Sequence, residues 1–335
     1  MREGPRQPAE LCAALSAALR RGIPGASDVR SLRRVSGGAS QETWSFDASL
    51  AGALVPLILR RRPGGSEDQP PRSVALPLET EAELLRQAGE SGVPVPEVRM
   101  LLEPEDGLGS GYVMERLAGE TIARRILRDD TFAAVRPKLA RQCGEILARI
   151  HAIPCERLPQ LTTADFAGQL GSYRAVFDGF GRPYPVFELA FRWLADHQPG
   201  PTPVAFVHGD FRNGNLLIDA DGVRGVLDWE IAHRGDPMED LGWICVNSWR
   251  FGAEPPVGGF GQREDLFAGY ETAGGRRVDP ERVRLWEIFG TLKWGIMCMM
   301  QYSVFERGVD RSVERAAIGR RSSETEIDLL HLLLK

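Results

Sequence analysis

The segment from Val204 to Glu230 constrains the fold more than any other part of the chain. It reads VAFVHGDFRNGNLLIDADGVRGVLDWE and contains three short apolar runs, at Val204–Val207, Leu216–Ile218 and Gly225–Leu227. Such short runs, bounded by glycine, asparagine and aspartate, are typical of strands and too short for ordinary helices. We therefore predict a compact region of three short strands in this segment.

Polar residues stand at the ends of these predicted strands. Asp210 and Asn215 lie between the first two runs, and Asp228 follows the third. Side chains in these positions suit phosphoryl transfer, in which one carboxylate accepts the proton of the attacking hydroxyl while an amide oxygen and a second carboxylate hold magnesium. The spacing from Asp210 to Asn215 equals that of the protein-kinase catalytic loop, H-R-D-x-x-x-x-N. A single aspartate would be interpreted as a helix cap, but this ordered set favours a kinase-like site.

Three motifs, HGDFRNGN, GVLDWE and GDPMEDLGW, closely resemble those of the aminoglycoside phosphotransferase family. The likeness extends over nearly the whole chain, and the tail AAIGRRSSETEIDLL looks like that of the kinase-like domains fused to some acyl-CoA dehydrogenases. The resemblance implies that Asp210 is the general base and that Asn215 and Asp228 bind Mg²⁺. It also implies ATP, with GTP as the alternative, as co-substrate. Three further residues of the motifs are implied to support the loop: His208, Asp236 and Asp240.

The distribution of apolar residues changes near residue 118 from a mixed pattern to a helical one. Before this point we predict an amphipathic helix over Leu11, Leu15 and Leu19, then three strands, a helix and two strands. The resemblance implies an α+β, bilobal, protein-kinase-like fold. Its small N-terminal antiparallel-sheet lobe would hold the nucleotide, and its larger, mostly helical C-terminal lobe would hold the catalytic and substrate-binding residues. The two lobes are predicted at residues 1–118 and 119–335, and the first strands at Val29–Val35, Glu42–Asp47 and 54–60.

A glycine-containing turn, SGGAS, lies between the first two predicted strands, where a kinase places the loop that covers the phosphates. Glycine there allows the backbone N–H groups to approach the phosphates closely. An ordinary hairpin turn is the alternative interpretation. The predicted phosphate-contacting residues of this turn are Ser36, Gly37, Gly38 and Ser40.

A cation for the phosphates is expected at the end of the third predicted strand. Kinases use lysine there, but the only lysines of this chain are Lys138, Lys293 and Lys335. Arg60 is therefore our candidate, and a solvated strand end is the alternative. Glu81, on the following helix, is placed like the acid that pairs with this cation, although the resemblance alone favours it over its neighbouring glutamates.

The segment GYVMERLAGE resembles the hinge between the lobes of a kinase. By that resemblance Met114 would lie at the back of the adenine pocket, and the backbone from Glu115 to Leu117 would bind the adenine edge. An ordinary core strand that runs into a loop is the alternative.

Composition excludes several classes of partner and site. The net charge of −5 provides no positive field that would attract nucleic acid or an anionic membrane. The five cysteines include no C-x-x-C pair, so a reducing cytoplasm is expected rather than a disulfide framework. No histidine has the spacing of a zinc site. We expect a monomer or a homodimer.

The acceptor is predicted from the charge of the two segments that should surround it. Residues 156–205 and 246–280 each hold five acidic residues and four arginines, so neither is strongly acidic. Polycationic aminoglycosides need an acidic pocket, and a neutral or anionic hydroxyl compound fits better. A hydroxyacyl thioester and a hydroxylated natural product are both open. Three alternatives remain: a nucleotide-binding pseudokinase, an aminoglycoside kinase and a metal-dependent phosphoesterase.

Overall fold

The computed structural model describes residues 8–37, 41–63 and 75–334. The chain divides into two compact units, each with its own contacts. The first holds the described residues up to Gly119, together with Glu156–Gln160 and Arg224–Ala232. The second holds Glu120–Cys155, Leu161–Val223 and the described residues from His233 onward. The units are described separately below.

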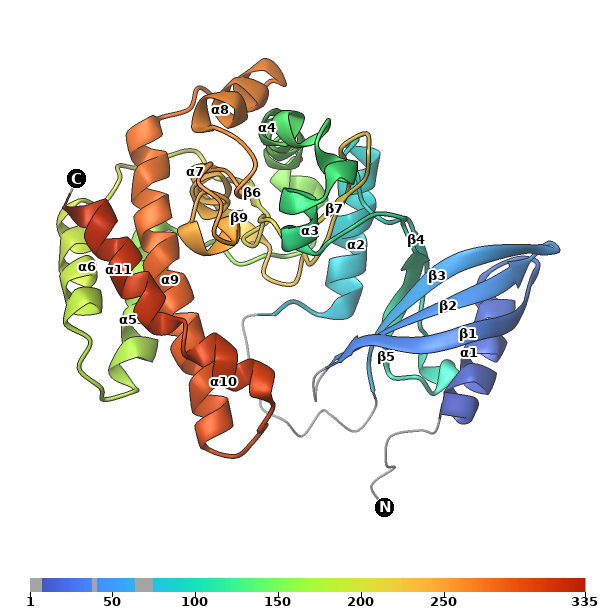
Figure 1. Cartoon of the computed structure of the whole chain (residues 1–335). Helices are drawn as coiled ribbons and strands as arrows, with labels where there is room; N and C mark the ends of the chain where they lie inside the picture. Colours follow the sequence, from blue (N-terminus) through green and yellow to red (C-terminus); the bar gives the residue numbers. More distant parts are fainter. Residues whose placement is uncertain (1–7, 38–40, 64–74, 335) are drawn as a thin grey trace. The chain divides into compact units, whose positions relative to one another are not determined.

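The first unit contains a five-stranded sheet whose paired strands are antiparallel (Figure 1). The strand order is β1-β2-β3-β5-β4, and helix α2 separates β3 from β4 in the chain. The predicted order of three strands, a helix and two strands is therefore confirmed. The elements are β1 (Ala26–Gly37), β2 (Glu42–Leu50), β3 (Ala53–Arg62), α2 (Leu78–Glu90), β4 (Val98–Leu101) and β5 (Ser110–Glu115).

Helix α1 (Pro8–Gly22) covers the sheet with one apolar face. Leu11, Leu15 and Leu19 recur at helical spacing and are fully buried, in one cluster with Phe46 of β2 and Leu57 of β3. Removal of these side chains from water stabilises the contact, at roughly 1.5–3 kcal/mol for each fully buried leucine. The predicted amphipathic helix is thus confirmed and belongs to the core of the first unit.

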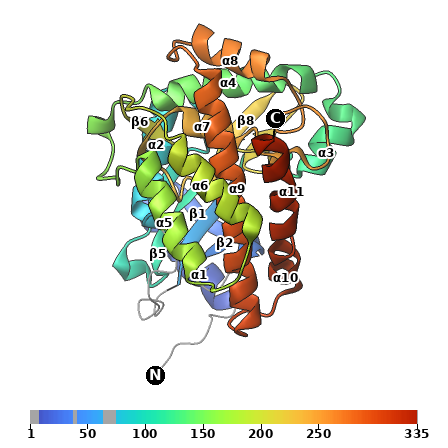
Figure 2. The same ribbon diagram turned by 90° about the vertical axis from the view of Figure 1, so that its left-hand side faces the viewer.

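The second unit is mainly helical and is arranged around α9, a helix of 27 residues. Figures 1 and 2 show α10 and α11 beside α9, which also contacts α5, α6 and α7. None of the helices among the described residues combines the length and hydrophobicity of a membrane span. The helices are α3 (Ala123–Arg128), α4 (Leu139–His151), α5 (Phe166–Asp178), α6 (Pro185–Asp196), α7 (Met238–Trp243), α8 (Arg263–Thr272), α9 (Pro280–Glu306), α10 (Val313–Gly319) and α11 (Ser322–Leu333).

Glycine allows α7 and α9 to approach very closely. A Cβ added at Gly242 would lie 2.6 Å from the Cβ of Trp286 and 2.8 Å from the carbonyl oxygen of Val283. Any larger residue would therefore push the two helices apart. The contact matters for the site because α7 ends at Trp243 and α9 carries Lys293.

The predicted short strands are confirmed, with one strand in addition. They are β6 (Ala205–Val207), β7 (Leu216–Ile218) and β8 (Val223–Val226). In the turn after β7, Asp219 Oδ1 accepts hydrogen bonds from the backbone N–H groups of Asp221 and Gly222. The additional strand, β9 (His233–Gly235), pairs antiparallel with β6. Its three residues are too few to show a period in the sequence.

Candidate active site

Asp210 lies in the loop between β6 and β7 and accepts three side-chain hydrogen bonds. Asn215 Nδ2 donates to Oδ2 at 2.6 Å, while Trp243 Nε1 and Arg212 Nε donate to Oδ1 at 2.8 and 3.0 Å. The side chain remains 17% exposed. A carboxylate held by three donors has a fixed orientation, and its remaining exposed surface can face a ligand.

Asp240 of α7 braces this loop through its backbone. Its two carboxylate oxygens accept from the N–H groups of His208 and Gly209, both at 2.9 Å. His151 Nε2 lies 3.0 Å from Asp240 Oδ2, and its Nδ1 lies 2.9 Å from the hydroxyl of Tyr270. Burial alone would raise the pKa of Asp240, but the hydrogen bonds and charges of the two histidines outweigh this effect and lower it. The carboxylate is thus ionised and binds the loop tightly.

The other two predicted supporting residues act on neighbouring parts of the structure. The backbone N–H of Asp210 donates to His208 Nδ1 at 3.1 Å. The side chain of His208 thus stabilises the turn of the chain from His208 to Asp210. Asp236 accepts from the backbone N–H of Met238 and from Trp286 Nε1, at 3.0 and 2.8 Å. Asp236 therefore opens α7 and connects it to α9.

Lys293, on α9, lies buried beside the ring of Trp243. Its Nζ is 4.8 Å from the ring centroid and 3.5 Å from Glu239 Oε1. Burial alone would lower the pKa of Lys293, but Tyr173, Glu239 and Asp210 outweigh burial and raise it. The positive charge of Lys293 thus lies beside the indole ring of Trp243, which donates to Asp210.

A second cluster, the arginine cluster, belongs to the first unit and is centred on Arg60 of β3. Its guanidinium contacts Glu81 Oε2 at 3.2 Å, Asp228 Oδ1 at 3.1 Å and Glu230 Oε2 at 3.4 Å. Gln41 Oε1 accepts from the same group at 3.3 Å. One cation therefore faces three carboxylates. Burial alone would lower the pKa of Arg60, but these carboxylates outweigh it and raise the pKa.

Glu81 is the only one of three neighbouring glutamates in contact with Arg60 in the described structure. Glu81 is 1% exposed, whereas Glu79 is exposed and Glu83 binds Gln87 at 2.9 Å. Burial raises the pKa of Glu81 to about 7, although the charge of Arg60 opposes the rise. The sequence contains a signal that distinguishes Glu81: its carboxylate lies on the apolar face of α2, between Leu78 and Leu85 in helical spacing.

Asp228 has a left-handed backbone, with φ of 67°. This conformation is uncommon for residues other than glycine, and aspartate and asparagine tolerate it best. Strained residues of this kind concentrate at functional sites, where the surrounding structure holds them in place. The predicted magnesium ligand Asp228 thus combines an unusual backbone with a direct contact to Arg60.

The remaining predicted nucleotide residues lie on the sheet of the first unit or beyond the described residues. Ser36 and Gly37 are in β1, paired with Thr43 and Glu42, and the predicted Gly38 and Ser40 lie outside the described residues. Met114 and Glu115 end β5. The Glu115 N–H donates to the carbonyl oxygen of Glu97, the residue before β4, and the Arg116 N–H donates to that of Pro56 in β3. Two N–H groups of the predicted hinge are therefore already paired within the first unit. The predicted Leu117 follows them in the chain.

Several residues around Asp210 are not identified by sequence patterns alone. Arg212 belongs to the motif HGDFRNGN, but the motif does not indicate that its side chain contacts Asp210. Lys293 carries a usable signal, since it is one of only three lysines and interrupts an apolar helical run. Trp243 has no such signal, because an aromatic residue at a helix end is usually core.

Comparison with known proteins places the chain in a family. The profile of the phosphotransferase enzyme family matches residues 31–286, more than half of the chain. Acyl-CoA dehydrogenase family member 10 of Mus musculus is 29% identical over 233 residues, which cover 64% of this chain and 20% of that protein. The chain spans 20 to 27% of the length of the first acyl-CoA dehydrogenase relatives that it matches.

Solved structures with the same fold cover nearly the whole chain. A protein of Ralstonia eutropha, provisionally described as an aminoglycoside phosphotransferase, is 21% identical with a TM-score of 0.73 and covers 94% of this chain and 95% of its own. A thermostable mutant of aminoglycoside phosphotransferase APH(4)-Ia, in ternary complex with AMP-PNP and hygromycin B, is 16% identical with a TM-score of 0.58 and covers 93% and 97%. These likenesses confirm the predicted bilobal, kinase-like α+β fold, and the profile match shows that the chain belongs to the phosphotransferase enzyme family.

Proposed function

We propose that this protein transfers the γ-phosphoryl group of ATP to a hydroxyl group of a small molecule, with Asp210 as general base. The observation that carries the proposal is the set of three donors on the Asp210 carboxylate, one of which is Asn215 at kinase spacing. Catalysis of phosphoryl transfer depends mainly on positioning and charge. A carboxylate with a fixed orientation and an exposed edge supplies the positioning.

Two residues would hold Mg²⁺ in this proposal, Asn215 and Asp228. Carboxylate and amide oxygens are the protein ligands that magnesium prefers, usually with phosphate oxygens and water. Nδ2 of Asn215 donates to Asp210, which leaves its amide oxygen as the metal-binding atom. Around Asp228, three carboxylates share one arginine, so this cluster has a surplus of negative charge that fits a cation. When bound, the metal would neutralise the charge of the phosphates.

The nucleotide would lie on the first unit in this proposal. Arg60 takes the place of the phosphate-binding lysine, and Glu81 orients its guanidinium. Arginine binds phosphate through a planar fork of donors and keeps its charge at any working pH. The AMP-PNP complex of the structural relative APH(4)-Ia supports ATP, and GTP is the alternative. Ser36, Gly37 and the backbone near Leu117 are proposed to contact the phosphates and the adenine.

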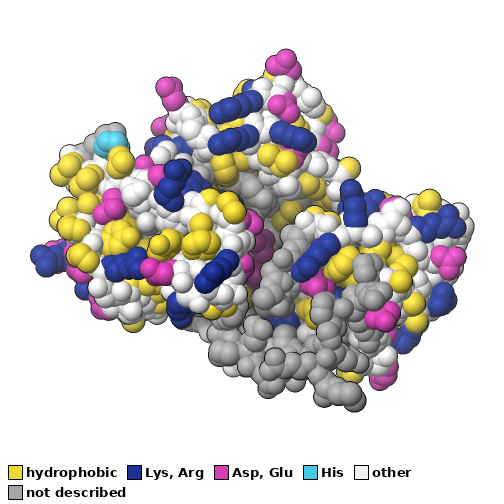
Figure 3. Space-filling model, turned by 60° about the horizontal axis from the view of Figure 1, so that its bottom comes forward, with side chains coloured by type: hydrophobic (Ala, Val, Ile, Leu, Met, Phe, Trp, Pro, Cys, Tyr) yellow, Lys and Arg dark blue, Asp and Glu magenta, His cyan; other side chains and the backbone are white. Residues whose placement is uncertain are grey.

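The acceptor is proposed to be neutral or anionic rather than polycationic. Among the coloured side chains of each unit in Figure 3, basic side chains occur beside acidic ones. The relative from Mus musculus is a family member of the acyl-CoA dehydrogenases, which favours a hydroxyacyl thioester among the acceptors. An aminoglycoside remains the alternative, because a relative of the same fold was solved with hygromycin B.

All five cysteines are free, which supports a cytoplasmic location.

The decisive experiment compares nucleotide binding in the wild type and in Asp228→Asn. Asparagine tolerates the left-handed backbone of this position, so the substitution removes the charge without much added strain. ATP with magnesium should raise the unfolding midpoint of the wild type, and the substitution should reduce the magnesium-dependent part of the rise. Asp221→Asn, at an exposed turn, is the matched control. A wild type that shows no magnesium-dependent rise would contradict the proposal, and binding without acceptor-dependent ADP release would indicate a pseudokinase.

A further inference from the structure

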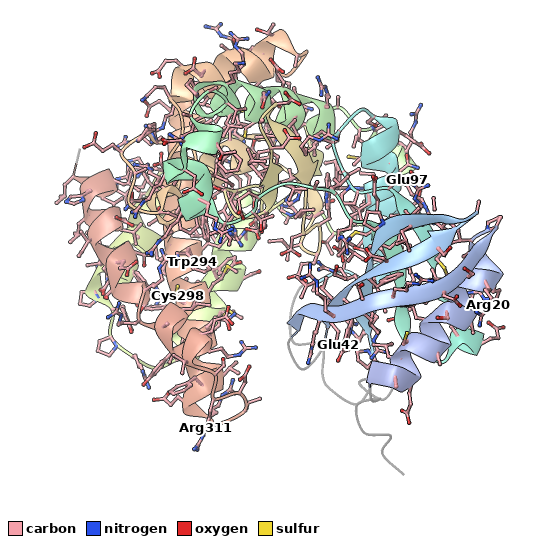
Figure 4. All side chains as sticks on the ribbon, turned by 45° about the vertical axis from the view of Figure 1, so that its right-hand side comes forward. Arg20, Glu42, Glu97, Trp294, Cys298 and Arg311 are labelled. Carbon is pink, nitrogen blue, oxygen red and sulfur yellow. The ribbon has the colours of Figure 1, made fainter. Side chains whose placement is uncertain are left out.

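A cavity of about 510 Å³ opens in the second unit beside the first turns of α9. Its wall combines residues of α8, α9, α11 and the short 3₁₀ helix η5 (Asn247–Arg250). Figures 1 and 2 show the C-terminal end of α11 beside the start of α9, and Trp294 and Cys298, labelled in Figure 4, lie further along the same helix. The volume falls within the roughly 300–1,000 Å³ of small-molecule sites. We call this space the α9 cavity.

Three arginines line the α9 cavity around a single buried carboxylate, that of Glu287. Arg263 Nη2 donates to both oxygens of Glu287, at 2.6 and 2.9 Å, and Arg250 Nη2 donates to Oε1 at 2.9 Å. Arg284 lies one helical turn before Glu287, so the two side chains are neighbours on the surface of α9. Arg284 Nη2 also donates to the carbonyl oxygen of Leu332 at 2.9 Å. Three cations thus act on one carboxylate in this cavity.

The two other acidic residues of the wall contribute little negative charge to the interior of the α9 cavity. The side chain of Glu281 is 83% exposed and lies 3.9 Å from the guanidinium of Arg284. Burial raises the pKa of Asp328, although a hydrogen bond from Asn247 and the charge of Arg250 oppose the rise. Burial thus weakens Asp328 as a counter-charge, because it favours the neutral form. The α9 cavity therefore has a surplus of positive charge.

Two of these arginines, Arg263 and Arg284, have surface and donors for a ligand. Their side chains are 36% and 38% exposed. A guanidinium carries five N–H donors, and the contacts described above use Nη2 of each residue. Phe267 of α8 and Leu332 of α11 are half-buried and line the same space. The α9 cavity therefore offers two guanidinium groups beside an apolar wall.

We propose that the α9 cavity binds a small phosphate monoester. Arg263 and Arg284 hold the phosphate, and the organic part of the ligand lies against Phe267 and Leu332. A phosphate monoester carries close to two negative charges at neutral pH and three strong acceptor oxygens. It therefore matches two guanidinium groups, each of which binds phosphate through a fork of donors. A carboxylate has one charge and two oxygens, so it is the weaker match.

The first test measures the binding of three probes of similar size by isothermal titration calorimetry, without nucleotide: phenyl phosphate, benzoate and benzyl alcohol. Phenyl phosphate should bind most tightly, and benzoate more weakly by roughly tenfold, as expected for the loss of one hydrogen bond between charged groups. Benzyl alcohol, which has no charge, should not bind detectably. An absence of phenyl phosphate binding, or tighter binding of benzoate, would overturn the proposal.

The second test assigns the binding of phenyl phosphate to the α9 cavity. Arg284→Gln should weaken it by roughly tenfold or more, and Arg263→Lys, which keeps the charge but loses the fork, should weaken it less. Arg311→Gln, at an exposed arginine labelled in Figure 4, is the control and should leave the affinity unchanged. Arg284 is partly exposed, so its variant should fold even if Arg263→Lys does not. An unchanged affinity in a folded Arg284→Gln protein would contradict the proposal.

The α9 cavity is separate in sequence from the proposed site of phosphoryl transfer. Its lining residues lie between Asn247 and Leu332, whereas the residues proposed to act on ATP lie between Ser36 and Asp228. The rise of the unfolding midpoint with ATP and magnesium should therefore be the same in Arg284→Gln as in the wild type. Failure of the cavity to bind phenyl phosphate and failure of the protein to bind ATP are thus distinguishable.

Discussion

Asp210 and Asp228 are two proposed active-site carboxylates with very different surroundings. Asp210 is held by N–H donors alone, two of which carry no net charge. Asp228 instead shares the single guanidinium of Arg60 with Glu81 and Glu230. A carboxylate held by three donors has a fixed orientation. A carboxylate in a cluster with surplus negative charge is stabilised by a further cation.

The two surroundings also differ in how the chain assembles them. Two of the donors to Asp210 come from the next five residues, so a local loop nearly completes the site. The contact between Arg60 and Asp228 joins residues 168 positions apart. The first arrangement depends on the loop and on Asp240 and Trp243 of α7, whereas the second depends on correct folding of the first unit. The comparison thus predicts chemical defects at Asp210 and combined binding and stability defects around Arg60.

The largest effect on turnover is expected for Asp210→Asn. Loss of the general base should reduce turnover by roughly 10²–10⁴-fold. The shift of the unfolding midpoint with ATP and magnesium should remain close to that of the wild type, because Asp210 does not bind the nucleotide in the proposed mechanism. Initial rates of acceptor-dependent ADP release, together with the midpoint shift, test this expectation. A loss of nucleotide binding as large as that in Asp228→Asn would show that the two carboxylates have the same role.

A stability effect is expected when the arginine cluster loses its cation. Arg60→Ala leaves Glu81 buried without a partner, and loss of one member of a buried ion pair costs roughly 3–5 kcal/mol. Arg60→Lys keeps the charge but cannot form the same set of contacts, so the unfolding free energy should fall less. Urea denaturation of both variants measures the difference. Arg30→Ala, at an exposed position of β1, should change the unfolding free energy little. An equal loss of stability in Arg30→Ala would show that the arginine cluster does not explain the loss in Arg60→Ala.

The smallest expected effect is a change of stability with pH that depends on Glu81. The pKa of Glu81 is about 7 in the folded protein and near its ordinary value of 4.5 when unfolded. Between these values the folded state binds more protons than the unfolded state, so this residue makes the free energy of unfolding fall as pH rises from about 4.5 to about 7. In Glu81→Gln this contribution disappears.

Urea denaturation of wild type and variant at pH 5 and pH 8 measures this difference. Glu79→Gln, at an exposed position of the same helix, controls for the loss of one charge. Equal pH dependence in the wild type and in Glu81→Gln would place the titration elsewhere in the protein.

Much of the fold could be predicted because it is written in local patterns. Leu11, Leu15 and Leu19 show helical spacing, and the short runs around Asp210 and Asn215 show strands with polar ends. The family resemblance supplied the bilobal arrangement, which no local pattern contains. Strand β9 could not be predicted, since its three residues are ordered by pairing with β6 rather than by their own propensity.

The surroundings of the site were less predictable for a physical reason. Trp243 of α7 and Lys293 of α9 reach the region of Asp210 from two different helices, and contacts between distant segments leave no periodic trace in the sequence. Arg60 could be proposed because a kinase-like site needs a cation and no lysine occurs before residue 138. The resemblance favoured its partner Glu81 over Glu79 and Glu83, and the burial of Glu81 agrees with that choice.

The proposed use of Arg60 in place of the phosphate-binding lysine affects how this protein can be detected. Nucleotide analogues that carry an acylating group label ATP-binding proteins by reaction with a deprotonated lysine amine. Arg60 offers no such amine, and its neighbouring carboxylates keep the guanidinium protonated. Surveys that identify kinases by lysine acylation at the phosphate site should therefore pass over this enzyme, even where it is abundant and active. Dicarbonyl reagents, which modify arginine, are the matching chemical probes, and bound ATP should protect Arg60 from them.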